Sequence, residues 1–188
     1  MENYDILEWV NFFEKSKGQF DLKKDAFETD SIVLYPGRFY VLEYMATTKD
    51  VFNTRPVIIS LGVSQKDPES FLCLDLSILP KKIRMIFIKR FFEIYRKEIL
   101  DNIDRVLDVE DVEKQTWMKS FTYDNICRAI PQIPLKNAIK KYKIKNTRKI
   151  YALPFNRVYK VVGDYCDENF YMNGNIKQIQ ADFLKKIR

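Results

Sequence analysis

Three short segments rich in β-branched and aromatic residues constrain the fold more than any other feature of the sequence. They follow the turn signal Pro36-Gly37 and are separated by polar connections. Such runs between turn-forming residues predict an antiparallel meander, which needs a second layer packed on it. The predicted strands and connections cover, in order, residues 38–45, 47–55, 56–63, 64–69 and 71–76.

A helical pattern directly after the meander can supply that second layer. Pro80 suits the first turn of a helix, and apolar residues recur at helical spacing over 81–100. In the first strand, alternation places Tyr40, Leu42 and Tyr44 on one face, and Val41 on the other. One face of the strand should pack on the helix, whose inward residues we expect to include Ile83, Phe87, Phe91, Ile94 and Tyr95.

The remaining segments are shorter and complete an α+β fold. A length of 188 residues and a hydrophobic content of 46% suit one domain with its own core. We therefore expect a single α+β domain over residues 1–188, with a small antiparallel sheet packed against the long helix. The other predicted elements are peripheral helices at about 4–15 and 176–187, a loop at 14–31, short helices within 101–130, a basic helix at 135–145 and a strand at 149–162.

The composition argues against most enzyme classes. The chain has no histidine, which excludes Ser-His-Asp and Cys-His catalysis as well as histidine-based zinc sites. Its five glycines form no phosphate-binding loop, so we expect no nucleotide cofactor and no enzyme activity. The three cysteines, Cys73, Cys127 and Cys166, lack metal-ligand spacing and indicate free thiols in a reducing compartment.

The amino-terminal sequence shows no basic stretch followed by an apolar one, as a signal peptide would. No apolar run approaches the roughly 18 residues that span a bilayer. We therefore expect no membrane association and a protein made and kept, or assembled into something larger, in the cytoplasm of the cell that produces it.

Charge alternates along the chain in blocks. Residues 1–31 carry eight acids against four lysines, whereas residues 125–163 carry ten bases and no acid. The net charge is +6. Unlike blocks on one chain make head-to-tail contacts between copies electrostatically possible, and a basic block is compatible with nucleic-acid contact.

The strongest candidate binding residues lie in the basic block, interleaved with Tyr142. They could neutralise phosphates of double-stranded DNA without reading its sequence, or they could meet an acidic patch on a partner protein. If the segment is helical, Lys140 and Lys143 lie close together. The candidate residues are Lys140, Lys141, Lys143, Lys145, Arg148 and Lys149.

An acidic run offers a third, less favoured, possibility. A metal-dependent nuclease needs clustered carboxylates. The acidic run offers such carboxylates at Asp108, Glu110, Asp111 and Glu113. On a helix, however, side chains so close in sequence do not all face one point.

The central part of the chain also resembles a family of small virion proteins of large tailed phages. The resemblance begins at Pro36-Gly37, continues through Phe39, Tyr40 and Tyr44, and resumes at Arg55-Pro56, Leu79-Pro80 and Arg84. A second block, Ala138-Ile139-Lys140-Lys141-Tyr142 with Arg148, matches as well. These features look like those of DNA end protectors of contractile-tailed phages and of portal-proximal ring proteins of crAss-like phages.

The resemblance implies a structural role in the virion. The first expectation is a portal- or neck-associated ring or connector protein around the DNA channel, forming a homo-oligomeric ring beside the portal protein. The alternative is a genome-end-binding protein. The resemblance assigns no catalytic residue and no cofactor, and its matched residues form a turn, strands and a helix start.

Overall fold

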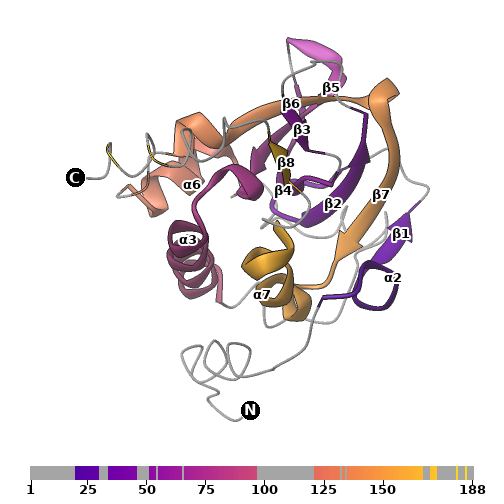
Figure 1. The fold of residues 1–188 in the computed structure, drawn as a ribbon. Helices are drawn as coiled ribbons and strands as arrows, with labels where there is room; N and C mark the ends of the chain where they lie inside the picture. Colours follow the sequence, from indigo (N-terminus) through magenta and orange to yellow (C-terminus); the bar gives the residue numbers. More distant parts are fainter. Residues whose placement is uncertain are drawn as a thin grey trace.

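The computed structural model has an α+β architecture in which one curled antiparallel sheet carries helices on its outer face (Figure 1). This confirms the fold class predicted from the sequence, whereas the single domain over 1–188 stays a prediction. The structure describes residues 20–29, 34–45, 51–53, 55–64, 66–96, 121–131, 133, 135–166 and 170–172, together with the single residues 181 and 185.

The main sheet has six strands in the order β1-β7-β2-β4-β5-β6, and all neighbours are antiparallel. Its strands are β1 (Phe27–Thr29), β2 (Phe39–Tyr44), β4 (Val57–Ser64), β5 (Asp67–Asp75), β6 (Ile139–Lys143) and β7 (Thr147–Leu153). A separate two-stranded sheet pairs β3 (Val51–Asn53) with β8 (Phe170–Met172). The helices are α2 (Leu22–Asp25), α3 (Lys81–Ile94), α6 (Tyr123–Ala129) and α7 (Val158–Lys160). Shorter helical turns are η1 (Leu76–Ile78), η3 (Leu135–Ala138), η4 (Ile144–Asn146), η5 (Phe155–Arg157) and η6 (Val161–Tyr165).

The predicted meander is confirmed by β2, β4 and β5, which are neighbours in the sheet. Phe39 of β2 lies opposite Ile59 of β4, and Ile59 lies opposite Leu74 of β5. The turn before β2 requires glycine for two reasons. Gly37 has a φ of 78°, and a side chain at this position would overlap the ring of Phe121.

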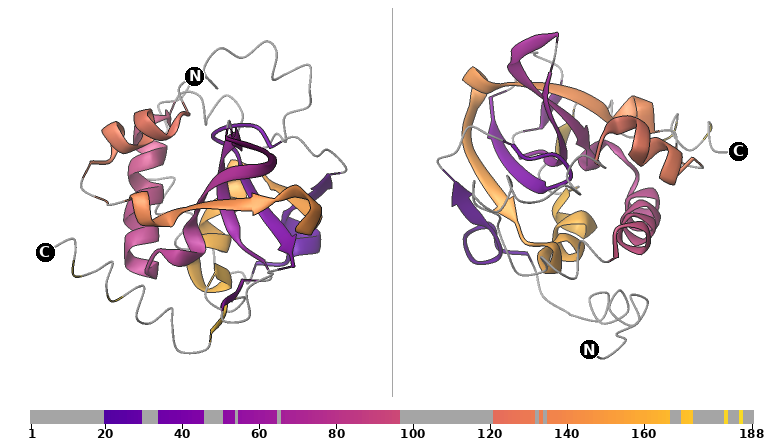
Figure 2. Two further views of the ribbon diagram at one scale, coloured as in Figure 1. Left: turned by 90° about the horizontal axis from the view of Figure 1, so that it is seen from above. Right: turned by 180° about the vertical axis from the view of Figure 1, so that it is seen from behind.

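The sheet is curled, because a very short connection joins β6, at one end of the sheet, to β7, the second strand from the other end. Between β7 and β6 lie four inter-strand steps, which would separate them by about 19 Å in a flat sheet. The three residues of η4 let the chain span only about 13 Å. Tyr44 of β2 accordingly packs edge-on against Tyr142 of β6, with ring centroids 4.9 Å apart. Strands β6 and β7 therefore form one bent ribbon around the sheet (Figure 2).

The curl encloses a small apolar core that the strands fill with alternate residues. Because the opposite face is also covered, β2 and β4 read as nearly continuous apolar runs rather than as alternating ones. Tyr40 and Leu42 share one face, as predicted, and this face points into the curl; Tyr44 lies half-buried at its rim. The buried residues of this inner core are Leu34, Tyr40, Leu42, Ile58, Phe71, Cys73, Tyr142, Ile150 and Ala152.

The outer face of the sheet packs on α3, as the sequence predicted. Phe39 and Val41 belong to this second, larger core, together with Phe87 and Phe91 of the helix. The rings of Phe39 and Phe91 meet edge to face at 5.5 Å. Phe87 is fully buried, so the helix contributes its aromatic stripe to the main core of the protein.

Helix α3 begins after Pro80 but ends at Ile94, earlier than the predicted residue 100. The prediction that Ile94 faces inward is wrong, since this side chain is 43% exposed. The buried stripe is centred near Arg84 and Phe91, and Ile94 lies at its edge, as the last residue of the helix. Buried Arg84 joins the start of α3 to η6 and is described with the other family-like residues below.

The predicted basic helix at 135–145 is wrong. The segment forms η3, β6 and η4 instead, because residues 139–143 pair one by one with residues 70–74 of β5. This pairing places Tyr142 inside the curl, among the buried residues of the inner core. The predicted strand at 149–162 is correct only as far as Leu153. Pro154, which has no N–H for a sheet ladder, ends it, and helical turns follow.

Smaller differences concern the connections and the chain ends. Strand β3 lies within the predicted connection 47–55, and α2 and β1 lie within the predicted loop 14–31. Helix α6 falls in the region 101–130, where short helices were predicted. The predicted peripheral helices at about 4–15 and 176–187 fall outside the described residues, apart from residues 181 and 185.

Candidate binding surface

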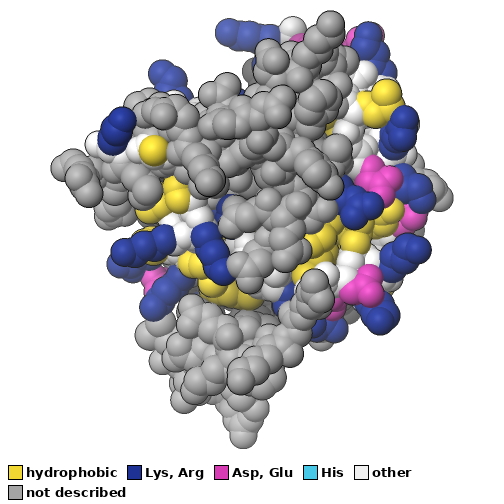
Figure 3. All heavy atoms as spheres, viewed as in Figure 1, with side chains coloured by type: hydrophobic (Ala, Val, Ile, Leu, Met, Phe, Trp, Pro, Cys, Tyr) yellow, Lys and Arg dark blue, Asp and Glu magenta, His cyan; other side chains and the backbone are white. Residues whose placement is uncertain are grey.

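All six predicted binding residues lie on the bent ribbon formed by β6, η4 and the start of β7, which we call the basic ribbon (residues 139–149). Each of the six is exposed. Lys and Arg side chains crowd the edge of the molecule where β6 turns into β7 (Figure 3). The six residues are Lys140, Lys141, Lys143, Lys145, Arg148 and Lys149.

The strand conformation changes which lysines share a face. Lys141 and Lys143 are two residues apart in β6 and project to the same side, away from the curl. Lys140 projects to the side of Tyr142, not with Lys143 as in a helix. Lys145 sits in the η4 turn. The basic residues therefore line both sides of a narrow ribbon instead of forming one helix face.

Lys149 differs from the other five, because it is neutralised within the chain. Its Nζ lies 2.7 Å from Glu28 Oε1 of β1, and this hydrogen bond raises the pKa of the lysine above its usual value. Across the described parts of the chain, no carboxylate forms an ion pair with the other five cations, Lys140, Lys141, Lys143, Lys145 and Arg148.

Beneath the ribbon, a buried polar network holds β6 in place. The Tyr142 hydroxyl donates a 2.6 Å hydrogen bond to Asp75 Oδ2 at the end of β5. Asp75 also accepts from the Ser77 N–H at 2.9 Å, and the Ser77 hydroxyl accepts from the Val57 N–H of β4 at 3.1 Å. Burial raises the pKa of Asp75 to about 6, although both hydrogen bonds oppose the shift. The network ties three strands together directly behind the exposed lysines.

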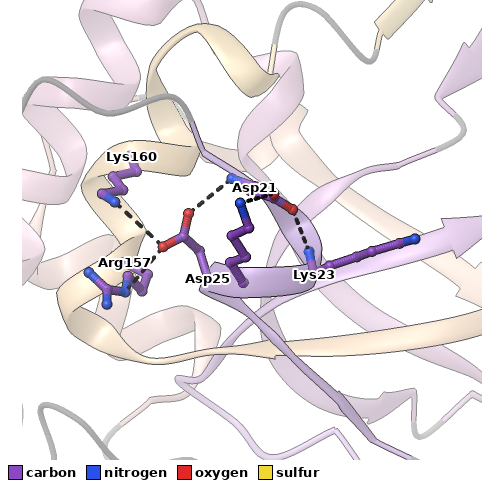
Figure 4. Close-up of polar contacts among 6 residues, drawn as sticks. Asp21, Lys23, Asp25, Arg157 and Lys160 are labelled. Atoms are coloured by element: carbon purple, nitrogen blue, oxygen red, sulfur yellow. Dashed lines mark hydrogen bonds and ion pairs between the residues drawn. The ribbon is translucent and has the colours of Figure 1, made fainter.

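A hollow of about 700 Å³ between α2, β2, β7 and α7 is a feature that the sequence did not suggest. On its α7 side, Asp25 Oδ1 lies 3.3 Å from Arg157 Nε and 3.4 Å from Lys160 Nζ (Figure 4). The second oxygen of Asp25 accepts from the Asp21 N–H at 2.9 Å. Asp25 is far from Arg157 and Lys160 in the sequence, so no local sequence pattern predicts this cluster.

The carboxylates that line this hollow are each paired with a cation. Arg55 lies 3.7 Å from Glu43, which also accepts a long hydrogen bond from the Tyr151 hydroxyl at 3.4 Å. Lys24 lies 3.5 Å from Asp21. Each carboxylate of the lining is matched by a cation, and the lining cations outnumber the carboxylates by one, so the hollow carries little net charge. The basic ribbon is therefore the stronger candidate for binding a charged partner.

The residues that carry the family resemblance occupy positions that shape the fold. Pro36 and Gly37 form the turn before β2, Phe39 lies in the outer core, and the Tyr40 hydroxyl accepts from the Tyr35 N–H. Arg84 is fully buried and donates to the carbonyls of Leu79, Val162 and Gly163 at 2.8, 2.8 and 3.0 Å. The remaining members are Tyr44 at the rim of the curl, Arg55 beside Glu43, Pro56 before β4, and Leu79 and Pro80 at the start of α3.

The acidic run at Asp108, Glu110, Asp111 and Glu113 falls outside the described residues. Within the residues that are described, no three Asp, Glu or Cys side chains come together as metal ligands. Among the same residues, no helix has the length and apolar character to cross a membrane.

Comparisons of the chain with protein-family models, curated proteins and solved structures found no match. The case for a function therefore depends on the residues themselves and on the sequence resemblance described above.

Proposed function

We propose that this chain is a non-catalytic structural protein of a tailed-phage virion, a portal- or neck-associated ring or connector protein around the DNA channel. The observation that carries the proposal is the basic ribbon, where five exposed cations form no ion pair with any carboxylate of the described residues. A surface of this kind binds an acidic partner. The family resemblance suggests that this acidic partner is a component of the virion.

A second candidate is the genome-end-binding protein, and the same five cations favour it. Phosphate contacts require charge without base recognition, and each contact releases counterions from DNA. The two candidates therefore differ in what meets the ribbon: an acidic protein surface in the first, the DNA backbone in the second.

The deciding variant replaces Lys141 and Lys143 by Gln, because these two side chains share one face of β6. If the ribbon contacts DNA, the slope of log affinity against log salt concentration for duplex DNA should become less steep by about the contribution of two phosphate contacts. If the ribbon contacts protein, the variant should bind DNA like the wild type but fail to enter particles. The matched control replaces Lys82 and Lys89, two exposed lysines of α3, and thus removes the same charge elsewhere.

Measurements of DNA affinity by fluorescence anisotropy over a salt series, and of incorporation into particles by complementation, separate these outcomes. An unchanged salt slope together with normal incorporation would contradict both candidates and leave the ribbon a solvated surface. Closed oligomers in native mass spectrometry would support the ring, whereas a chain that contacts no copy of itself in the particle would refute it.

A further inference from the structure

Strand β6 is an outer strand of the main sheet, and among the described residues only one of its edges is paired with another strand. Residues 139–143 pair with residues 70–74 of β5. In the described part of the chain, no strand pairs with the opposite edge. An antiparallel strand directs the N–H and C=O groups of alternate residues to each side, so about two or three residues of β6 present theirs at the free edge. Seen from above, β6 crosses the outside of the sheet (Figure 2).

The side chains of β6 select what can pair with this edge. Lys141 and Lys143 stand on one face of the strand and Lys140 on the other, so a strand added at the edge meets positive charge on both faces. A second copy of β6 would bring lysines against lysines, and edge lysines are a common protection against such self-pairing. An added strand with acidic side chains would place carboxylates beside these lysines.

The strand is also held rigidly before any partner arrives. Tyr142 is buried, donates to Asp75 at 2.6 Å, and packs against the ring of Tyr44. A strand fixed in this way requires little ordering on binding, which favours affinity. Strand β1, at the other end of the sheet, differs: it has three residues, and its Glu28 is engaged by Lys149.

We propose that the free edge of β6 binds an extended acidic segment of an assembly partner as an additional strand of the sheet. The inference rests on the proposed structural function and names the chemistry of its partner. Main-chain hydrogen bonds to β6 give the affinity, and carboxylates beside Lys140, Lys141 and Lys143 give the preference for acidic sequences.

The test uses the full chain and a blocked peptide of about ten residues that alternates Glu and Val, a length and pattern suited to one strand. Binding is measured by fluorescence anisotropy, and amide hydrogen exchange is followed with and without the peptide. We expect slower exchange of amides within 139–143. Methylation of alternate peptide nitrogens, placed on the bonding edge, should weaken binding by roughly tenfold or more, because it removes main-chain donors. Replacing Lys141 and Lys143 by Gln should weaken it by roughly fivefold, and replacing Lys82 and Lys89 should have little effect.

Two outcomes would overturn the inference. The first is equal binding of peptides methylated on either edge, because side-chain charge alone would then explain the affinity. The second is an absence of exchange protection within 139–143 at saturating peptide. Either result leaves the proposed function intact if the Lys141 and Lys143 variant still fails to enter particles, so the two proposals can fail separately.

Discussion

Asp75 should make the stability of this protein fall as the pH rises through the mildly acidic range. The carboxyl is completely buried, with Tyr142 and Ser77 as its hydrogen-bond donors, and burial raises its pKa from about 3.8 to about 6. The folded chain thus holds the proton more tightly than the unfolded chain. Between the two pKa values, unfolding releases a proton, and stability is lost as the pH rises.

The size of the effect follows from the difference of about two pH units between the folded and unfolded pKa values. Each unit corresponds to about 1.4 kcal/mol of unfolding free energy. Asp75 therefore adds on the order of 3 kcal/mol to the free energy of unfolding below about pH 4, and this contribution is absent above about pH 6. Lys140, which lowers the pKa of Asp75 from the neighbouring strand, reduces the shift. Replacing Lys140 by Gln should therefore move the transition to higher pH.

The assay is urea denaturation of the wild type and of Asp75→Asn at several pH values between about 4 and 8. The amide that the variant carries at position 75 cannot ionise in this range. The contributions of all other titrating groups therefore cancel when the unfolding free energy of the variant is subtracted from that of the wild type. We expect the difference, wild type minus variant, to decrease by about 3 kcal/mol as the pH rises. A difference that stays constant with pH would refute the reasoning, since Asp75 would then have the same pKa in both states.

Three further substitutions test the core and the turn by denaturation. Phe87→Ala should destabilise the fold by roughly 3–5 kcal/mol because the ring is fully buried, whereas Ile86→Ala, at a 44% exposed neighbour, should cost less than about 1 kcal/mol. Gly37→Ala should cost more than about 1 kcal/mol, because the φ of 78° and the packed ring beside it both exclude a side chain; a smaller loss would mean that the turn relaxes. Arg84→Met should cost about 3–5 kcal/mol by leaving buried carbonyls without donors, and Arg90→Met, on the exposed side of α3, should stay within about 0.5 kcal/mol.

Elements defined by local signals could be predicted from the sequence. Strands β2, β4 and β5 are bounded by turn residues and rich in β-branched and aromatic side chains, and α3 repeats its apolar residues with a helical period. In contrast, Ile139 and Tyr142 are three residues apart among lysines, a spacing that fits a helix. Pairing with β5, far away in the chain, decides that this segment is a strand.

The candidate site likewise has features that could be predicted from local sequence and features that could not. The lysines and the arginine of the basic ribbon were identified from charge alone, which needs no structure. Their grouping was wrong, because the face on which a side chain lies depends on the period of its element. The contacts of the buried charges were not predicted at all. Asp25 meets Arg157 and Lys160, and Arg84 meets carbonyls near residue 162, through contacts that only the folded chain creates.

The bent ribbon also determines how late during synthesis the sheet and its inner core can be completed. Strands β2, β4 and β5 leave the ribosome together, but β2 pairs on its other side with β7, so Phe39 finds Leu153 only after most of the chain has been made. Until then the inner core lacks Tyr142, Ile150 and Ala152. Contacts between such distant residues slow folding and leave apolar surface exposed meanwhile. We therefore expect nascent chains that end before β6 to bind chaperones, and full-length chains to be released from them.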